Sequence, residues 1–171
     1  IKPASLTRFS SEEIRSSIRR LREEAVRLTG RADDVKSGEG GIRDIEFLVQ
    51  GAQMIASPDH PEVLTGNTLE AIARLGNVGI IPETTAARLA EDYRRLRRVE
   101  HYLQVYEDRQ VHAIPDDGDG RAALARRLDG PHADAATLMD DLAMRRARIR
   151  DSYERFLRGA PLDDSTTRTD G

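Results

Sequence analysis

Three glycines within four positions, Gly38, Gly40 and Gly41, form a short loop directly before an apolar, helix-like segment. A glycine loop that opens a helix presents backbone N–H groups and the positive end of the helix dipole, which suits a phosphate group. Lys36 and Arg43 lie on either side of the loop and add two cationic side chains. We therefore predict that these five residues bind phosphate.

The loop matches neither of two common phosphate-binding motifs. No Gly-Lys-Ser/Thr follows it, as in a Walker A loop, and Arg43 occupies the position of the third glycine in the dinucleotide-binding fingerprint. The alternative interpretation is a tight turn that packs one helix on another, since glycine-rich turns are ordinary. The spacing leaves both interpretations open.

Two carboxylates, Asp44 and Glu46, follow the loop. In a helix they point about 200° apart, so only one of them can face a given site. Glu46 then shares a polar stripe with Arg43, Gln50 and Gln53. This stripe is either a solvated face with an Arg43–Glu46 pair or, as the two glutamines suggest, a surface that hydrogen-bonds to a neighbouring domain.

Further charged residues follow in two long predicted helices. Residues 94–98 contain four arginines, which wrap around the helix and cannot all face one ligand, so we interpret them as a solvated face with Glu91 and Asp92 as partners. The arginines near the end of the chain have the same pattern and predict a charged outer face. His101 and His112 lack a third ligand at suitable spacing, so we expect no metal site of their own.

The composition narrows the class of protein. The 171 residues include 27 Lys+Arg, 30 Asp+Glu and no Cys, with a net charge of −3. This balance argues against a general nucleic-acid binder, and the lack of Cys excludes disulfides, a thiolate zinc site and a Cys nucleophile. No apolar run approaches the roughly 20 residues of a membrane span. We therefore expect a piece of a longer cytoplasmic protein that binds neither nucleic acid nor membrane.

Helical periodicity predicts an all-α fold, an antiparallel bundle of five to six helices with the glycine-rich loop near its N-terminal end. In the first helix, Ser10 and Glu13 form a capping box and one apolar stripe faces the core. That stripe consists of Ile14, Ile18, Leu21, Ala25 and Leu28. The further predicted helices cover residues 42–56, 68–75, 82–108, 121–128 and 135–158, and Asn67 with Glu70 predicts a second capping box at the start of the helix at 68–75. Residues 35–36 and 111–115 are predicted to be extended, and 116–120 a turn or mobile loop.

Residues 34–50 read Asp-Val-Lys-Ser-Gly-Glu-Gly-Gly-Ile-Arg-Asp-Ile-Glu-Phe-Leu-Val-Gln. They resemble the Lys-x-Gly-x-Gly-Gly-Ile-Arg-Glu/Asp-Ile-Glu-Phe-x-Val-Gln motif of bacterial glutamine synthetase adenylyltransferases, also called adenylyl-removing enzymes. Residues 68–72, 93–104 and 108–115 resemble further motifs of that family in the same order. The related PII uridylyltransferases share the glycine motif but diverge after it, so residues 45–50 favour the glutamine synthetase enzyme.

The resemblance implies an activity and a domain organisation. Each half of the family enzyme pairs a nucleotidyltransferase domain with a helical domain; one half attaches AMP to a tyrosine of glutamine synthetase, and the other removes it by phosphorolysis. Residues 108–115 resemble the N-terminal, adenylyl-removing half. By this resemblance, residues 1–41 are the tail of the nucleotidyltransferase domain, residues 42–160 are the helical bundle, and residues 161–171 are a disordered tail.

The resemblance also implies roles for the residues above. Asp44 and Glu46 are predicted to be catalytic, and the loop residues with Lys36 and Arg43 to bind the nucleotide. The Asp-x-Asp pair that holds metal in such transferases is expected upstream of Ile1, because Asp117-Gly118-Asp119 lies in a polar loop without strand context. We therefore expect Mg²⁺ and ATP or ADP in the full enzyme, no certain metal ligand in this chain and no cofactor requirement for this piece.

A last set of residues is predicted to face partners or a neighbouring domain: Gln50, Arg97, Arg98, Glu100, Gln104 and His112. The partners implied by the resemblance are glutamine synthetase, the PII signalling protein and the adjacent nucleotidyltransferase domain, in the regulation of nitrogen metabolism. Two alternatives stay open. In the first alternative the chain is the helical domain of a PII uridylyltransferase, and in the second it is a purely regulatory protein-binding bundle. In every case we expect the isolated chain to be inactive.

Overall fold

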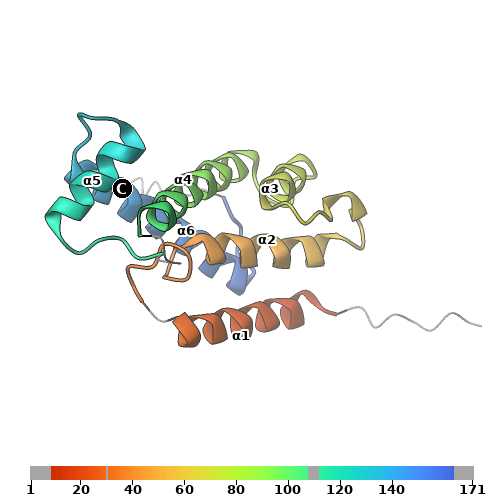
Figure 1. Cartoon of the computed structure of the whole chain (residues 1–171). Helices are drawn as coiled ribbons and strands as arrows, with labels where there is room; N and C mark the ends of the chain where they lie inside the picture. Colours follow the sequence, from red (N-terminus) through yellow and green to blue (C-terminus); the bar gives the residue numbers. More distant parts are fainter. Residues whose placement is uncertain (1–8, 30, 108–111, 164–171) are drawn as a thin grey trace, which may run out of the picture.

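The computed structural model describes residues 9–29, 31–107 and 112–163, and within them the chain is all-helical (Figure 1). The predicted all-α bundle is confirmed. A single short 3-10 helix, η1, connects the second and third helices of the described part. The elements are α1 Ser11–Thr29, α2 Ile42–Ala56, η1 Pro61–Val63, α3 Thr68–Asn77, α4 Glu83–Glu107, α5 Gly118–Asp129 and α6 Ala135–Arg158.

Helices α1 and α3 begin with the side-chain caps that the sequence predicts. Ser10 N–H donates to Glu13 Oε2 at 2.7 Å and Glu13 N–H donates to Ser10 Oγ at 3.2 Å, as a capping box requires. Asn67 Oδ1 accepts from the N–H of Glu70 at 3.0 Å at the start of α3. The turn predicted at 116–120 is wrong for residues 118–120, which belong to α5. Asp117 accepts from Gly120 N–H at 2.6 Å and caps that helix, so α5 begins at Gly118.

Helix α2 is the centre of the bundle. It packs against α1, α3, α4 and α6, and it runs antiparallel to both α1 and α4 (Figure 1). Its buried residues include Ile42, Ile45, Leu48 and Val49. The α1 residues Ile14 and Ile18 belong to the same continuous core. The domain boundary predicted at residue 41 therefore lies between two helices that share a core, and it stays a prediction for the longer protein. Most of the predicted disordered tail lies outside the described residues.

The predicted apolar stripe of α1 is only half correct. Ile14 and Ile18 are buried, but Leu21 is 56% exposed and Leu28 is 76% exposed. The reason is Arg22, which faces the bundle and bonds to the buried carboxylate of Asp44. Because this ion pair takes the inward position, the buried face of α1 turns away from the leucines.

The outer face predicted for α6 is wrong for Arg145 and Arg148, although Arg150 is exposed. Arg145 donates to Asp92 Oδ1 at 2.9 Å, and Arg148 donates to both oxygens of Asp92 at 2.6 and 2.8 Å. Asp92 itself is 1% exposed, so these arginines face α4. Arg95 of α4 in turn donates to Asp129 and Asp141. The acids expected to pair within α4 therefore pair between helices.

No helix in the described ranges is both long and apolar enough to cross a lipid bilayer.

Gly51 tests the close packing of α2. A Cβ at this position would lie 2.4 Å from Phe156 Cζ, so Gly51→Ala forces the α2–α6 contact apart. We expect it to lower the free energy of unfolding by about 1–3 kcal/mol, measured by urea denaturation. Gly118→Ala is the matched control, because Gly118 also lies in a helix but has open space around it. It should be neutral or stabilising by up to about 1 kcal/mol. Equal stability of the two variants would contradict the tight packing.

Candidate functional site

The glycine-rich loop is held by its own backbone hydrogen bonds. Asp34 Oδ1 accepts from the N–H groups of Lys36 and Ser37 at 2.8 and 2.9 Å. The N–H of Gly38 donates to Asp34 O at 2.9 Å, and the N–H of Gly41 donates to Gly38 O at 3.0 Å. These amides are used inside the chain, so the loop is a folded turn.

The amides at the start of α2 are used in the same way. The N–H of Ile42 donates to Val35 O, and the N–H of Arg43 donates to Lys36 O, both at 3.0 Å. The N–H of Gly40 donates to Asp44 Oδ2 at 2.7 Å. The donors that a helix N-terminus offers to phosphate are therefore engaged, and the predicted phosphate site depends on the side chains of Lys36 and Arg43. It stays a prediction.

The loop packs α2 against α6 through an unusually close backbone contact. Gly40 has φ +68°, and a Cβ there would lie 2.0 Å from the carbonyl oxygen of Arg146. Arg146 also donates from its side chain to Glu39 O at 3.0 Å and to Ala32 O at 2.8 Å. Burial lowers the pKa of Arg146. The glycine is thus required by both its conformation and its neighbour.

Asp44 ties α1 to the loop. Its side chain is 2% exposed and accepts from Arg22 Nε at 2.7 Å and from an Arg22 terminal nitrogen at 3.1 Å. With the bond from the N–H of Gly40, both carboxylate oxygens are used. Sequence reasoning missed Arg22, although its place one turn after Ile18 on the inward side of α1 was the available signal. The catalytic role expected of Asp44 stays a prediction.

Glu46 faces α4. It points away from Asp44, because residues two positions apart on a helix point about 200° apart. The hydroxyl of Tyr93 donates to Glu46 Oε1 at 3.2 Å, and burial is the main reason that the pKa of Tyr93 is raised. Gln50 is exposed, consistent with its place on the same stripe. Gln53 is buried and donates to Val63 O at 2.8 Å, so the hint that it reaches a neighbouring domain is wrong.

Glu100 of α4 is the meeting point of three motifs. Although 3% exposed, it has three cationic or ionisable neighbours. Lys36 Nζ lies 3.4 Å from Oε1, His112 Nδ1 lies 3.3 Å from the same oxygen, and Arg97 donates to Oε2 at 2.8 Å. His112 is placed by the main chain, since its carbonyl accepts from Val35 N–H at 2.8 Å beside a single bridge between Asp34 and Ala113. Extended segments were predicted at 35–36 and 111–115, and among the described residues this pairing corresponds to them. Residues 108–111 lie outside the described residues.

The other predicted partner residues on α4 differ in their contacts. Arg98 donates to Leu128 O at 2.7 Å and lies over the ring of Tyr102, so it also fixes α5. Gln104 is partly exposed on the side of Glu100. The partner roles of Arg97, Arg98 and Gln104 stay predictions.

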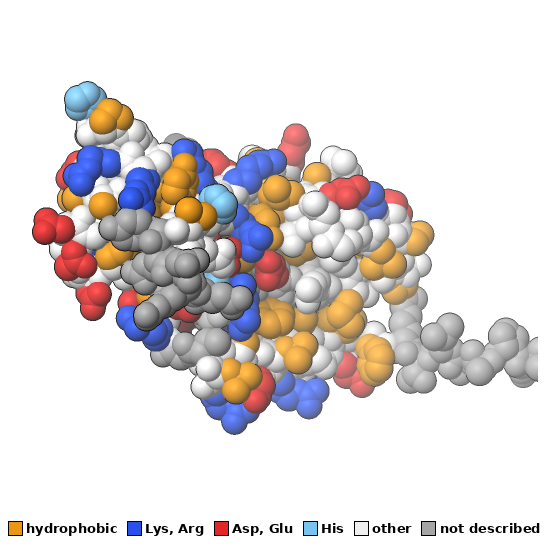
Figure 2. Space-filling view, in the orientation of Figure 1, with side chains coloured by type: hydrophobic (Ala, Val, Ile, Leu, Met, Phe, Trp, Pro, Cys, Tyr) orange, Lys and Arg blue, Asp and Glu red, His pale blue; other side chains and the backbone are white. Residues whose placement is uncertain are grey.

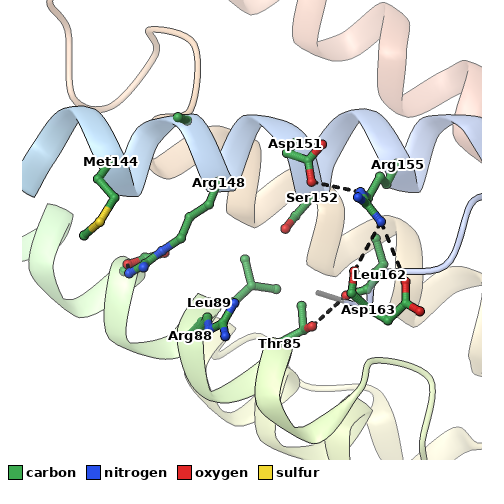
Figure 3. A pocket seen from close by; sticks show the side chains of 12 residues that line it. Thr85, Arg88, Leu89, Met144, Arg148, Asp151, Ser152, Arg155, Leu162 and Asp163 are labelled. Atoms are coloured by element: carbon green, nitrogen blue, oxygen red, sulfur yellow. Dashed lines mark hydrogen bonds and ion pairs between the residues drawn. The ribbon is translucent and has the colours of Figure 1, made fainter. Parts of the chain in front are cut away.

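A groove of about 590 Å³ separates α4 from α6 away from these residues (Figure 3). Thr85 donates to Leu162 O at 2.6 Å across one end, and Arg155 donates to Asp151 at 2.8 Å. Arginines and aspartates line the groove in pairs, so it offers no charge of one sign. None of the predicted site residues lines it.

A smaller cavity of about 220 Å³ lies beside the loop, lined in part by Asp44, Arg22 and Tyr153. The Tyr153 hydroxyl is buried, and no hydrogen-bond partner lies within reach among the described residues. Burial raises the pKa of Tyr153 to about 12.

Within 9–29, 31–107 and 112–163, no three His, Asp or Glu side chains converge on one point. These residues therefore do not fit a resident divalent cation, and no chemical step is assigned through one.

The Asp44–Arg22 pair gives a test of the loop. Asp44→Asn leaves the largely buried Arg22 without its counter-charge, and we expect the free energy of unfolding to fall by about 3–5 kcal/mol in urea denaturation. Glu24→Gln is the control. It should have no measurable effect on stability, because Glu24 and its partner Arg27, on the same helix as Arg22, are exposed. An Asp44→Asn variant as stable as the wild type would disprove the anchoring role.

Tyr153 gives a pH-dependent test. Its pKa is raised from 10 to about 12 in the folded state, so the unfolded state ionises first and stability is lost as the pH rises from 10 toward 12. Tyr153→Phe should show a shallower loss over this range in denaturation measurements. Near neutral pH it should be equal in stability or more stable by up to about 1 kcal/mol, because the lost hydroxyl has no partner. Identical pH profiles for the two proteins would refute this account.

The comparisons with known proteins fit these motifs. The GlnD PII-uridylyltransferase family model matches residues 13–157. The bifunctional glutamine synthetase adenylyltransferase/adenylyl-removing enzyme of Bordetella pertussis is 39% identical over 78% of this chain and 14% of that protein. The enzymes of the same name from Xanthomonas campestris pv. campestris and Mycobacterium leprae are 40% and 36% identical, over 74% and 78% of this chain and 13% and 14% of theirs.

The chain thus spans about 14% of the length of relatives of this kind. It belongs to the family that the GlnD PII-uridylyltransferase model describes, and the resemblance to glutamine synthetase adenylyltransferases is confirmed by these relatives.

Proposed function

We propose that this chain is a helical part of a cytoplasmic enzyme that attaches AMP to a tyrosine of glutamine synthetase or removes it by phosphorolysis. In this proposal a nucleotidyltransferase domain outside the chain supplies the metal-binding carboxylates, with Mg²⁺ and ATP or ADP. The helical part then supports the nucleotide site and presents the enzyme to its protein substrate. The names of the relatives support the reaction, and the chain's share of about 14% of their length supports a division of labour with other parts of the protein.

The single observation that carries the proposal is the convergence at Glu100. Lys36 comes from the glycine motif, Arg97 from the motif at 93–104 and His112 from the motif at 108–115, yet all three lie next to one buried carboxylate. Residues from three separate sequence motifs therefore meet at one polar cluster, which favours a role for this cluster in function.

A second candidate is PII uridylylation, which the description of the matching family model favours. PII is also a candidate regulatory partner in the first proposal. Arg94, Arg97 and Arg98 of α4 are exposed. Figure 2 shows Lys and Arg side chains over the region of α4 and α5, interspersed with hydrophobic side chains. Such a surface suits an acidic protein partner. Assays of the full-length protein with glutamine synthetase and with PII as separate acceptors distinguish the two reactions.

The division of labour predicts that the 171-residue chain is folded but inactive. Circular dichroism should show a helical protein with cooperative unfolding, while neither AMP transfer to glutamine synthetase nor phosphorolysis of adenylylated glutamine synthetase should be measurable. Adding the full-length protein to the same assay is the positive control. Activity of the 171-residue chain above background would overturn the proposal.

Glu46 is a half-buried carboxylate of the motif at residues 34–50, and the resemblance to the adenylyltransferases predicts that it is catalytic. In the full-length enzyme, Glu46→Gln should reduce the rate of AMP transfer or phosphorolysis on the order of 100-fold if it supports the metal or the nucleotide. Met54→Ala serves as the control for general surface effects, because Met54 is exposed on the same helix and is not among the predicted site residues. An unchanged rate for Glu46→Gln would assign Glu46 to packing with Tyr93.

A further inference from the structure

Glu100 is a buried carboxylate whose charge is not explained by the packing of the bundle. It is 3% exposed, and its Oε1 makes no hydrogen bond of ordinary geometry to the described residues. An isolated buried carboxylate is costly, so its neighbours must stabilise it electrostatically. Those neighbours are the Lys36 ammonium, the Arg97 guanidinium and the imidazole of His112.

The cations beside Glu100 are much less buried than the carboxylate they share. The side chain of Lys36 is 31% exposed and that of Arg97 is 50% exposed, against 4% for Glu100. An ammonium has three donors and a guanidinium five, and each of these groups directs only part of its donors at Glu100. Both cations thus flank one carboxylate while keeping donors that Glu100 does not use and a partly exposed side chain.

We propose that Glu100 is a positioning residue that holds Lys36 and Arg97 side by side as a binding site for phosphate groups. The inference rests on the proposed function, in which the phosphates belong to the nucleotide or to the inorganic phosphate of phosphorolysis. In this site two side chains, and not the backbone amides of the glycines, are the hydrogen-bond donors to the phosphate group. Glu100 does not touch the phosphate itself. It fixes the two cations that do.

The sign of the effect of Glu100→Gln separates positioning from simple charge balance. If Glu100 only neutralised its neighbours, removing its negative charge would strengthen the binding of an anion. If Glu100 positions Lys36 and Arg97, the same change releases both side chains and weakens binding. One lost charge-assisted contact corresponds to about a tenfold change in the dissociation constant.

The test is an NMR titration of the ¹⁵N-labelled chain with inorganic phosphate and, separately, with ADP. In the wild type we expect chemical-shift changes around Lys36, Arg97 and His112. We expect Glu100→Gln and Lys36→Met each to weaken binding about tenfold or more, and the double variant to bind no more weakly than either single one. Shift changes with phosphate alone identify the phosphate group as the recognised part, and changes with ADP alone identify the nucleotide; both support the site.

Asp92→Asn is the matched control, because Asp92 is a buried carboxylate on the same helix that also holds two cationic side chains, Arg145 and Arg148. It should lower the melting temperature yet leave phosphate and ADP binding unchanged. Should Glu100→Gln fail to fold, Glu100→Asp gives the same test, since it keeps the charge but shortens the reach to Lys36.

The proposal is overturned if neither probe shifts these residues, if Glu100→Gln binds as tightly as the wild type or more tightly, or if the effects of Lys36→Met and Glu100→Gln simply add. A failure of the proposed function has a different appearance. In that case the full-length protein transfers no AMP, while phosphate binding by this chain and its dependence on Glu100 are unaffected.

Discussion

The carboxylate of Asp44 is the interaction on which the arrangement around the glycine loop depends. It binds Arg22 of α1 and the N–H of Gly40 at the same time, and so joins the first helix to the loop. Gly40 in turn lies against the backbone of Arg146 in α6. Asp44 thereby links α1 to the loop directly and the loop to the distant helix α6 through Gly40, and α2 packs its apolar core against both helices.

The same constraint explains how the site is built. Because the loop is pinned at Asp44, Lys36 at its other end is held within 3.4 Å of Glu100, and the extended pairing beside Asp34 brings His112 to the same carboxylate. The backbone amides of the three glycines and those at the start of α2 are hydrogen-bonded within the chain. Side chains are therefore the main candidates for contacts to a ligand, which is a different chemistry from that of the common glycine-rich phosphate loops.

The sequence predicted the features that depend on neighbouring residues. Helix starts at Ser10 and Asn67 follow from capping, and the opposite directions of Asp44 and Glu46 follow from the helix period. Contacts between distant helices were not predicted. Asp92 has possible partners on its own helix as well as on α6, and spacing does not show which it takes. The exposure of Leu21 has the same origin, because Arg22 faces inward and pairs with Asp44 of another helix.

The most direct test of the account uses the chemistry of Lys36, which is one of only two lysines in the chain, the other being Lys2. The rate at which an acylating reagent modifies Lys36 in the full-length protein is measured by mass spectrometry with and without ADP. If the cluster at Glu100 faces bound phosphate groups, ADP should slow the modification of Lys36 and leave that of Lys2 unchanged. An equal rate at Lys36 with and without saturating ADP would contradict the account.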